Sequence, residues 1–330
     1  MSGVTYGSFT PETYDELRSQ IQQETGILVR TFYWADYANG LDTNLGTSRT
    51  DALKTLSAAY AKCEAGKNDA VVVVSTGASA GFQRLSAAFT WSKAATHLIG
   101  VSNGISSSPR ASIRPTSGVT AFTPLFTLSA SGCLIQDIGF WSGFTTGTTA
   151  QLGVVVTGSY NRFVRAHIVG MADAESAADA GSRSIKIGGS GAGENEFINC
   201  TFGVDTVTRS AANASVELVG ATPRNKFVDC TFRFMTSAAT PLGIIGSAAG
   251  CIDRDTTFIR CTFINAIKST STVMDGLSTL PASAGGMLVL KDCTLVGITE
   301  FGTDATTRGQ IYVDGAAPTA ATSGVAVNPT

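Results

Sequence analysis

The amino-acid sequence predicts an all-β protein, a right-handed parallel β-helix (solenoid) with coils of about 30 residues. Three observations favour this fold class. A short motif, N-x-F-x-x-C-x-F, returns at near-constant spacing, strand-like segments lie between successive motifs, and no long segment with helical periodicity follows residue 66. One copy of the motif would indicate only a strand, whereas a fixed period indicates stacked structural repeats.

The first apolar position of the motif recurs six times. It is occupied by Ile135, Phe163, Phe197, Phe227, Phe258 and Leu290, at spacings of 28, 34, 30, 31 and 32 residues. Because successive coils of a parallel solenoid stack ~4.8 Å apart, equivalent side chains lie on top of one another. We therefore expect Phe197, Phe227 and Phe258 to form an aromatic stack inside the solenoid.

Two further columns accompany the aromatic one. The cysteine column contains Cys200, Cys230, Cys261 and Cys293, which we expect to be reduced, buried thiols. The asparagine column contains Asn161, Asn195 and Asn225. Asparagine suits positions where the chain turns, because it tolerates left-handed backbone angles and bonds neighbouring backbone groups. On an outward face the same stacking places Lys186 beside Glu217 as a surface ion pair.

Residues 1–45 precede the repeats and form an N-terminal arm. Thr10 as the cap and Pro11 as the first helical residue predict a short helix that ends at Gly26. Apolar residues line one face of this helix, and an aromatic cluster follows. These candidate docking or oligomer-contact residues are Tyr14, Leu17, Ile21, Phe32, Tyr33 and Trp34. The alternative is that the arm folds back onto its own subunit or onto a neighbouring one.

The β-helix domain is predicted over residues 46–300, with a helix over residues 50–64 at its start. Leu53, Leu56 and Tyr60 give this helix an apolar face. The open end of a solenoid exposes unpaired strand edges, so we expect the helix to cap that end. Residues 301–330 are assigned to a C-terminal tail.

Composition excludes several classes of partner. The net charge is −2 and no basic run occurs, which argues against nucleic acid. The longest apolar run, residues 70–74, is far shorter than the ~20 residues of a membrane-spanning helix. The first residues lack the basic and apolar regions of a secretory signal, so synthesis in a cytoplasm is expected.

No constellation of catalytic residues emerges from the sequence. Glycoside hydrolysis needs two carboxylates facing one groove, and the acidic residues here are dispersed. Asp229 and Asp292 occupy the same motif position, but Asn199 and Arg260 fill that position in other coils, which indicates a charge-balanced turn. We therefore assign no catalytic residue, metal ligand or cofactor, and expect a protein without enzymatic activity.

The segment "GTSRTDALKTLSAAYAKCEAG", followed by a Val-rich strand and the N-x-F-x-x-C coils, resembles right-handed β-helix proteins of the pectate-lyase and phage-tailspike type. The tail, "GQIYVDGAAPTAATSGVAVNPT", resembles that of a phage virion protein more than that of a secreted lyase. The resemblance covers residues 50–330.

The resemblance implies a structural protein of a bacteriophage virion, made in the host cytoplasm. A homotrimeric head decoration (cement) protein is the favoured role, because the segments outside the solenoid are short. Its partners would be capsid or other virion proteins, with a host surface glycan as a further partner and neither nucleic acid nor membrane. One alternative is a tail spike or fibre that binds or cleaves host polysaccharide, and another is a polysaccharide lyase of the secreted type.

Overall fold

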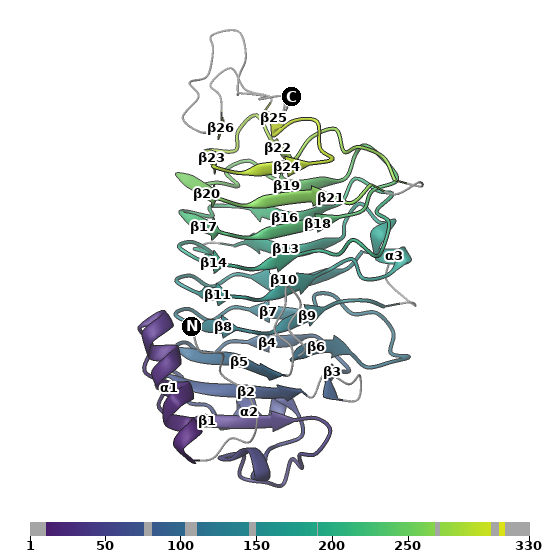
Figure 1. Ribbon diagram of the computed structural model, residues 1–330. Helices are drawn as coiled ribbons and strands as arrows, with labels where there is room; N and C mark the ends of the chain where they lie inside the picture. The colour runs from purple at the N-terminus through teal and green to yellow at the C-terminus, as the bar shows by residue number, and fades with distance from the viewer. Residues whose placement is uncertain are drawn as a thin grey trace.

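The computed structural model describes residues 11–75, 81–102, 111–144, 150–189, 191–267, 271–304 and 310–313. The side chains of residues 11–14 and 303–304 are outside that description. Most described elements are short β-strands, which wind in successive coils along one axis (Figure 1).

The strands form three parallel sheets, and each complete coil adds one strand to each of them. Sheet A contains β1 (Phe32–Asp36), β2 (Asp69–Ser75), β5 (Thr96–Ser102), β8 (Leu134–Gln136), β11 (Arg162–Val164), β14 (Glu196–Ile198), β17 (Asn225–Val228), β20 (Asp255–Ile259), β23 (Met287–Lys291) and β26 (Ile311–Val313). Sheet B contains β3 (Gln83–Leu85), β6 (Ser112–Pro115), β9 (Gly139–Trp141), β12 (His167–Val169), β15 (Thr201–Phe202), β18 (Thr231–Phe234), β21 (Thr262–Asn265) and β24 (Thr294–Val296). Sheet C contains β4 (Phe89–Trp91), β7 (Phe126–Leu128), β10 (Leu152–Val156), β13 (Arg183–Gly188), β16 (Ala214–Val219), β19 (Leu242–Gly246), β22 (Ser278–Leu280) and β25 (Gly302–Asp304). The predicted fold class, a right-handed parallel β-helix, is confirmed.

Helices occupy little of the described chain. They are α1 (Pro11–Thr25), the 3-10 helix Arg49–Asp51, α2 (Leu56–Lys62) and α3 (Ala174–Ala177). The expected capping helix is present as α2, but it is shorter than residues 50–64, because Thr55 caps its first turn and Leu53 pairs with Ala35 in an extended bridge. Leu56, Ala59 and Tyr60 are buried against the first coils. Among the described residues, no helix is long and apolar enough to cross a membrane.

The repeated aromatic residues stack inside the solenoid in the register that the motif spacing gives. Phe163, Phe197, Phe227 and Phe258 are cross-strand neighbours in sheet A. Their ring centroids lie 4.7, 4.5 and 4.3 Å apart, and the ring planes are within 19° of parallel. A second stack runs through Phe202, Phe232 and Phe263 of sheet B. These rings are fully buried, and burial of such large apolar surfaces is a main source of stability.

The cysteine column lies next to the aromatic stack, at the turn from sheet A to sheet B. Each thiol donates to the carbonyl of the phenylalanine in the preceding coil, at Sγ–O distances of 3.4–3.6 Å. Cys200, Cys230 and Cys261 are buried and Cys293 is partly exposed, and all four are free thiols. Burial raises the pKa of the Cys230 thiol well above its usual value.

The asparagine column forms a hydrogen-bonded ladder at the turn from sheet C to sheet A. The Oδ1 atoms of Asn161, Asn195 and Asn225 accept from backbone N–H groups of the preceding coil, at 2.9–3.0 Å. Their Nδ2 atoms donate to carbonyls at 3.0–3.1 Å. The left-handed backbone angles fall one residue earlier, at Tyr160, Glu194 and Arg224. The ladder, rather than a tolerance for positive φ, therefore explains these asparagines.

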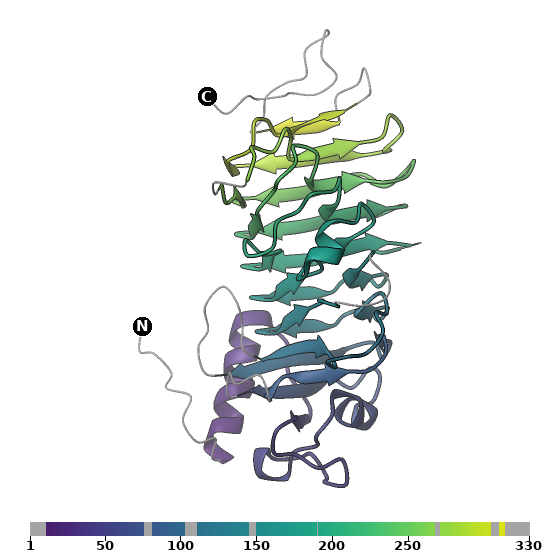
Figure 2. The same cartoon turned by 90° about the vertical axis from the view of Figure 1, so that its right-hand side faces the viewer.

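The first 45 residues are packed onto the solenoid and partly belong to it. β1 pairs in parallel with β2, so sheet A begins at Phe32. α1 lies along the outer face of the first strands of sheet A, as Figures 1 and 2 both show. Leu17, Ile21, Phe32 and Trp34 are buried there.

Of the six candidate docking residues, these four are therefore unavailable to a partner in this structure. Tyr33 is half-buried and packs against the solenoid core. The side chain of Tyr14 is outside the described residues. The arm folds back onto its own subunit because its apolar residues cover the outward valines of β2, at Val72 and Val74.

At the C-terminal end of the solenoid, β25 and β26 extend sheets C and A beyond residue 300.

Glu217 and Lys186 are cross-strand partners, as the repeat spacing predicts. The prediction of an exposed ion pair is wrong, because Glu217 is only 7% exposed. Arg183, also buried, brings its Nε within 3.2 Å of the Glu217 carboxylate, closer than the 3.7 Å of Lys186 Nζ. The Arg183 side chain thus covers the carboxylate and turns a surface pair into a buried cluster.

Candidate functional site

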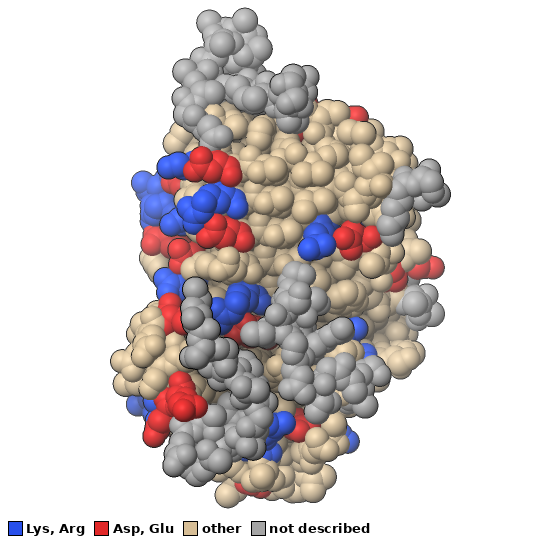
Figure 3. All heavy atoms as spheres, in the orientation of Figure 1, with Lys and Arg blue, Asp and Glu red and all other residues tan. Residues whose placement is uncertain are grey.

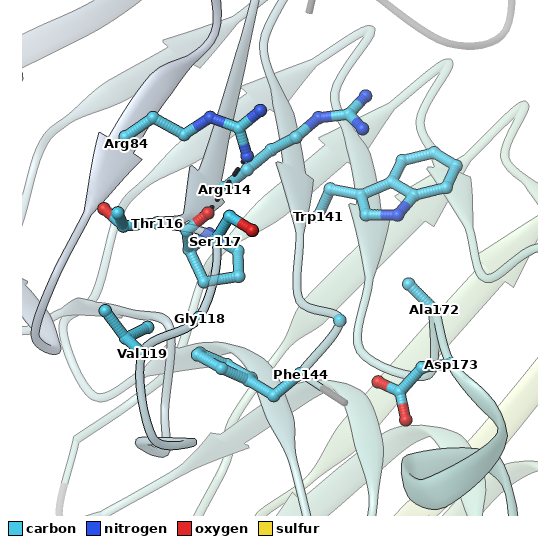
Figure 4. Close-up of a pocket in the computed structure, with 12 residues that line it drawn as sticks. Arg84, Arg114, Thr116, Ser117, Gly118, Val119, Trp141, Phe144, Ala172 and Asp173 are labelled. Carbon is cyan, nitrogen blue, oxygen red and sulfur yellow. Dashed lines mark hydrogen bonds between the residues drawn. The ribbon is translucent and has the colours of Figure 1, made fainter. Parts of the chain in front are cut away.

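A cleft opens on the outer face of sheet B, where the chain leaves its strands toward sheet C (Figure 4). Its volume is about 370 Å³. One wall consists of outward side chains from three successive strands: Arg84 of β3, Arg114 of β6 and Trp141 of β9. The opposite wall comes from the loops that follow these coils. We call this site the sheet B cleft.

The two arginines are positioned by the solenoid itself. Arg84 and Arg114 are direct cross-strand partners, and the register of β6 with β9 puts Trp141 next in the same outward column. Strand stacking therefore aligns two guanidinium groups and an indole along the axis at ~4.8 Å intervals. All three side chains are half-buried, with their heads at the cleft.

Aromatic rings hold the guanidinium groups in place. The Arg114 Cζ lies 3.9 Å from the centroid of Phe82 and 4.8 Å from that of Trp141. The Arg84 Cζ lies 5.7 Å from Phe82, and its Nη1 donates to the Pro115 carbonyl at 3.0 Å. Arg114 Nε also donates to the Ser112 hydroxyl at 3.1 Å. Cation–π contacts of this kind stabilise a charged guanidinium and fix its orientation. The arginines are thus oriented before any ligand arrives.

Trp141 rests on a buried histidine. The rings of Trp141 and His167 meet edge to face with centroids 5.4 Å apart. His167 Nε2 lies 2.8 Å from the Gly203 carbonyl, so that nitrogen carries the proton. Burial lowers the pKa of His167 to about 4. The imidazole is therefore neutral near pH 7 and serves as a rigid support for the indole.

The loop wall supplies one carboxylate and apolar contacts. Asp173 caps α3, and its carboxylate accepts from the backbone N–H of Ser176 at 3.0 Å and from its hydroxyl at 3.2 Å. Val119 and Phe144 face the cleft from the loops after β6 and β9 (Figure 4). In the part of the chain that the structure describes, no three His, Cys, Asp or Glu side chains gather in a way that could hold a metal ion.

None of the predicted ladder residues lies in this cleft. The aromatic, cysteine and asparagine columns face the interior or the turns, and Asp229 pairs with Arg260 at 2.7 Å on the surface. Arg84, Arg114 and Trp141 were missed, although the repeat contained the signal. They stand one position after Gln83, Ile113 and Phe140, and Phe140 belongs to the inward column of sheet B that continues to Phe202, Phe232 and Phe263.

Comparisons with known proteins find similarity in structure alone. No family model and no curated protein matches the sequence. The pectate lyase Pel9A matches with a TM-score of 0.59 and 15% identity, over 88% of this chain and 69% of that one. The pectin methylesterase PemA from Erwinia chrysanthemi matches with a TM-score of 0.50 and 14% identity, over 89% and 92%. A mutant of a pectin methylesterase, in complex with a hexasaccharide, matches with a TM-score of 0.51 and 13% identity. This match covers 89% of this chain and 92% of that one.

These neighbours define the class of fold: a parallel β-helix related to that of polysaccharide-acting enzymes. At such low identity the likeness shows the fold alone. The expectation of a protein without enzymatic activity is nevertheless contradicted, because the similar structures are a pectate lyase and pectin methylesterases. That expectation rested on the dispersed acidic residues, which offered no carboxylate pair facing one groove.

Proposed function

We propose that this chain is a carbohydrate-active β-helix protein whose sheet B cleft binds an anionic polysaccharide. The observation that carries the proposal is the outward column of Arg84, Arg114 and Trp141, with both guanidinium groups held by aromatic rings. A guanidinium donates two parallel hydrogen bonds to a carboxylate, sulfate or phosphate oxygen pair. An indole face packs against the C–H groups of a sugar ring.

The geometry of the cleft suits an extended chain with regularly spaced charges. The three side chains follow the solenoid axis, so a polysaccharide lying along sheet B meets them in sequence. The cation–π contacts fix the arginine heads in advance, which lowers the entropy lost on binding. A repeating uronate chain presents both a carboxylate and an apolar ring face in each unit, and it is the ligand chemistry that this column fits best.

The residues of the cleft favour elimination over hydrolysis. Hydrolysis needs two carboxylates, and the described lining of the cleft supplies one, Asp173. Elimination from a uronate needs a positive charge next to the carboxylate of the sugar, because that charge makes the neighbouring C–H group more acidic. A base removes that proton, the electron pair of the C–H bond forms a carbon–carbon double bond, the glycosidic C–O bond breaks, and the leaving oxygen takes up a proton from water. The two arginines supply the positive charge.

Binding of polygalacturonate oligomers, measured by calorimetry, tests this proposal. Arg114→Ala should weaken binding roughly tenfold to a hundredfold, the equivalent of about 1–3 kcal/mol for a charged hydrogen-bonding pair. Arg260→Ala, which removes a surface arginine from the Asp229 pair, is the matched control and should bind as the parent does. Equal affinity of the parent and Arg114→Ala would refute the proposal. Ultraviolet absorbance of unsaturated sugar products then reports cleavage.

The virion setting and the trimeric state stay predictions from the sequence resemblance. A carbohydrate-active cleft supports a tail spike or fibre that acts on host surface polysaccharide, rather than a head decoration protein. Copy number in purified virions, determined by quantitative mass spectrometry, separates the two roles: a few dozen copies or fewer indicate the tail and hundreds indicate the capsid. Sedimentation equilibrium of the purified chain tests for a trimer.

A further inference from the structure

A second cleft lies at the turn from sheet C to sheet A, away from the sheet B cleft. It has a volume of about 260 Å³ and lies between the end of α1 and three consecutive turns of the solenoid. The residues that matter for its chemistry are Thr25, Gly132, Tyr160, Arg162, Glu194 and Glu196. We call this site the turn cleft.

The most exposed aromatic ring at this turn is that of Tyr160, whose side chain is 64% exposed. Its backbone has a φ of 58°, a left-handed angle that an aromatic residue adopts only at a cost of about 1–3 kcal/mol. Gly132 and Glu194 hold the equivalent left-handed position in the coils on either side. The turn geometry thus directs the ring outward, away from any core it could join.

Gly132 leaves open the space beside that ring. A Cβ placed on Gly132, at φ 69°, would meet no atom within 4 Å. Any longer side chain at this position would project into the region next to Tyr160, because equivalent residues of adjacent coils stand only ~4.8 Å apart. One face of the turn cleft is therefore an aromatic platform with an open approach.

Paired charges form the other side of the turn cleft. Arg162 Nε donates to Glu196 at 2.9 Å, and Arg162 Nη1 donates to the Thr25 carbonyl at the end of α1, at 3.2 Å. Glu194 pairs with Arg224 in the next coil. Figure 3 shows the same pattern at larger scale, with acidic and basic side chains alternating along one edge of the visible face. Because these charges are paired, the electrostatic potential in the turn cleft is weak, and neither an anionic nor a cationic ligand is strongly attracted.

The geometry points to a second binding site, for a neutral sugar residue. The axial C–H groups of a pyranose ring pack on an aromatic face such as that of Tyr160. Each carboxylate retains acceptor positions beyond those its arginine uses, and sugar hydroxyls can donate to them. Because Glu194 and Glu196 are each paired with an arginine, the turn cleft does not attract an anionic ligand, in contrast to the arginines of the sheet B cleft. The volume lies below the ~300–1,000 Å³ of larger ligand pockets, which suits one ring or a chain end.

Calorimetric titration of the full chain with neutral oligosaccharides tests the inference, with maltohexaose, cellohexaose and a β-1,4-galactan hexamer as probes. At least one of them should bind. Tyr160→Ala should weaken that binding roughly tenfold or more, the loss of one aromatic platform. Tyr160→Phe keeps the ring and should stay within about threefold of the parent.

The controls separate this site from the sheet B cleft. Arg114→Ala should leave neutral-sugar binding unchanged while weakening polygalacturonate, and Tyr160→Ala should do the reverse. Tyr160→Ala should unfold at the denaturant concentration of the parent, because the ring is exposed. The inference is overturned if none of the three probes binds, or if Tyr160→Ala binds them as tightly as the parent. Neither result bears on the anionic ligand proposed for the sheet B cleft.

Discussion

The regular coils between residues 161 and 296 differ from the irregular coils between residues 82 and 144. In the regular coils, stacked phenylalanines from sheets A and B fill the interior. In the irregular coils, Trp91 and Phe126 of sheet C and Phe140 of sheet B fill it instead, with Phe126 and Phe140 centroids 4.8 Å apart. The interior rings are fully buried in both regions, but only in the first do they recur as a sequence motif.

The outward column of sheet B also differs between the two regions, in the chemistry of its side chains. In the irregular coils it holds Arg84, Arg114 and Trp141 at the cleft, whereas in the regular coils it holds Arg233, Ile264 and Val296. An inward position must fit the rings above and below it, since interiors are close-packed. An outward position is free of that constraint, so ligand-binding chemistry can be placed there without loss of the fold.

The largest expected effect distinguishes the two columns by stability. Phe227→Ala removes a fully buried ring between Phe197 and Phe258, and the resulting cavity should lower the free energy of unfolding by about 3–5 kcal/mol. Trp141→Ala, at the half-buried cleft position, should cost under about 2 kcal/mol. Chemical denaturation measures both. Equal losses would mean that the inward and outward columns are not energetically distinct.

A second substitution tests burial within the regular coils. Glu217→Ala leaves the buried Arg183 guanidinium without its carboxylate, which should cost roughly 2–4 kcal/mol. Arg260→Ala breaks the exposed pair with Asp229 and should cost under about 1 kcal/mol. Both are measured by urea denaturation at neutral pH. If Glu217→Ala proves as mild as Arg260→Ala, then Glu217 is solvated in solution.

The dependence of stability on pH should arise in the first half of the solenoid. Both histidines, His97 and His167, lie there, and burial lowers the pKa of each to about 4. The unfolded chain takes up these protons near pH 6.5 and the folded chain does not, so stability is complete above pH 6.5 and is lost as pH falls toward 4. Between pH 7.5 and 5 each histidine should account for a loss of about 2 kcal/mol.

Denaturation curves at the two pH values provide this measurement. His97→Gln should roughly halve the loss between pH 7.5 and 5, since one titrating group of two is removed. Carboxylates titrate mainly below this window. An unchanged pH dependence in His97→Gln would show that other groups account for it.

The smallest effect concerns reactivity rather than stability. Cys230 is buried and its pKa is raised by that burial, whereas Cys293, near the C-terminal end of the same column, is partly exposed. In the folded chain Cys230 should react with a disulfide reagent roughly a hundredfold more slowly than Cys293, because it needs local opening first. Time-resolved labelling with peptide mass spectrometry gives both rates. Similar rates would place Cys230 near the surface.

The sequence by itself determined the fold class and the interior columns. Positions that repeat every 30 residues or so become neighbours once the coils stack, so the motif alone identified Phe197, Phe227 and Phe258 as a stack and Cys200 and Cys230 as its companions. The same register contained Arg84, Arg114 and Trp141, but the outward position that they occupy is not part of the motif, so nothing marked them as a column.

Only the tertiary structure decided what the non-repeating segments do. The apolar face of α1 is visible in the sequence, but the cluster that it joins includes strands as distant as β11, at Val164. The loop wall of the sheet B cleft, at Val119, Phe144 and Asp173, joins segments of unequal length that share no register. Stacking energy fixes the positions of residues within the repeat, whereas segments outside it are positioned by whichever apolar surfaces they bury.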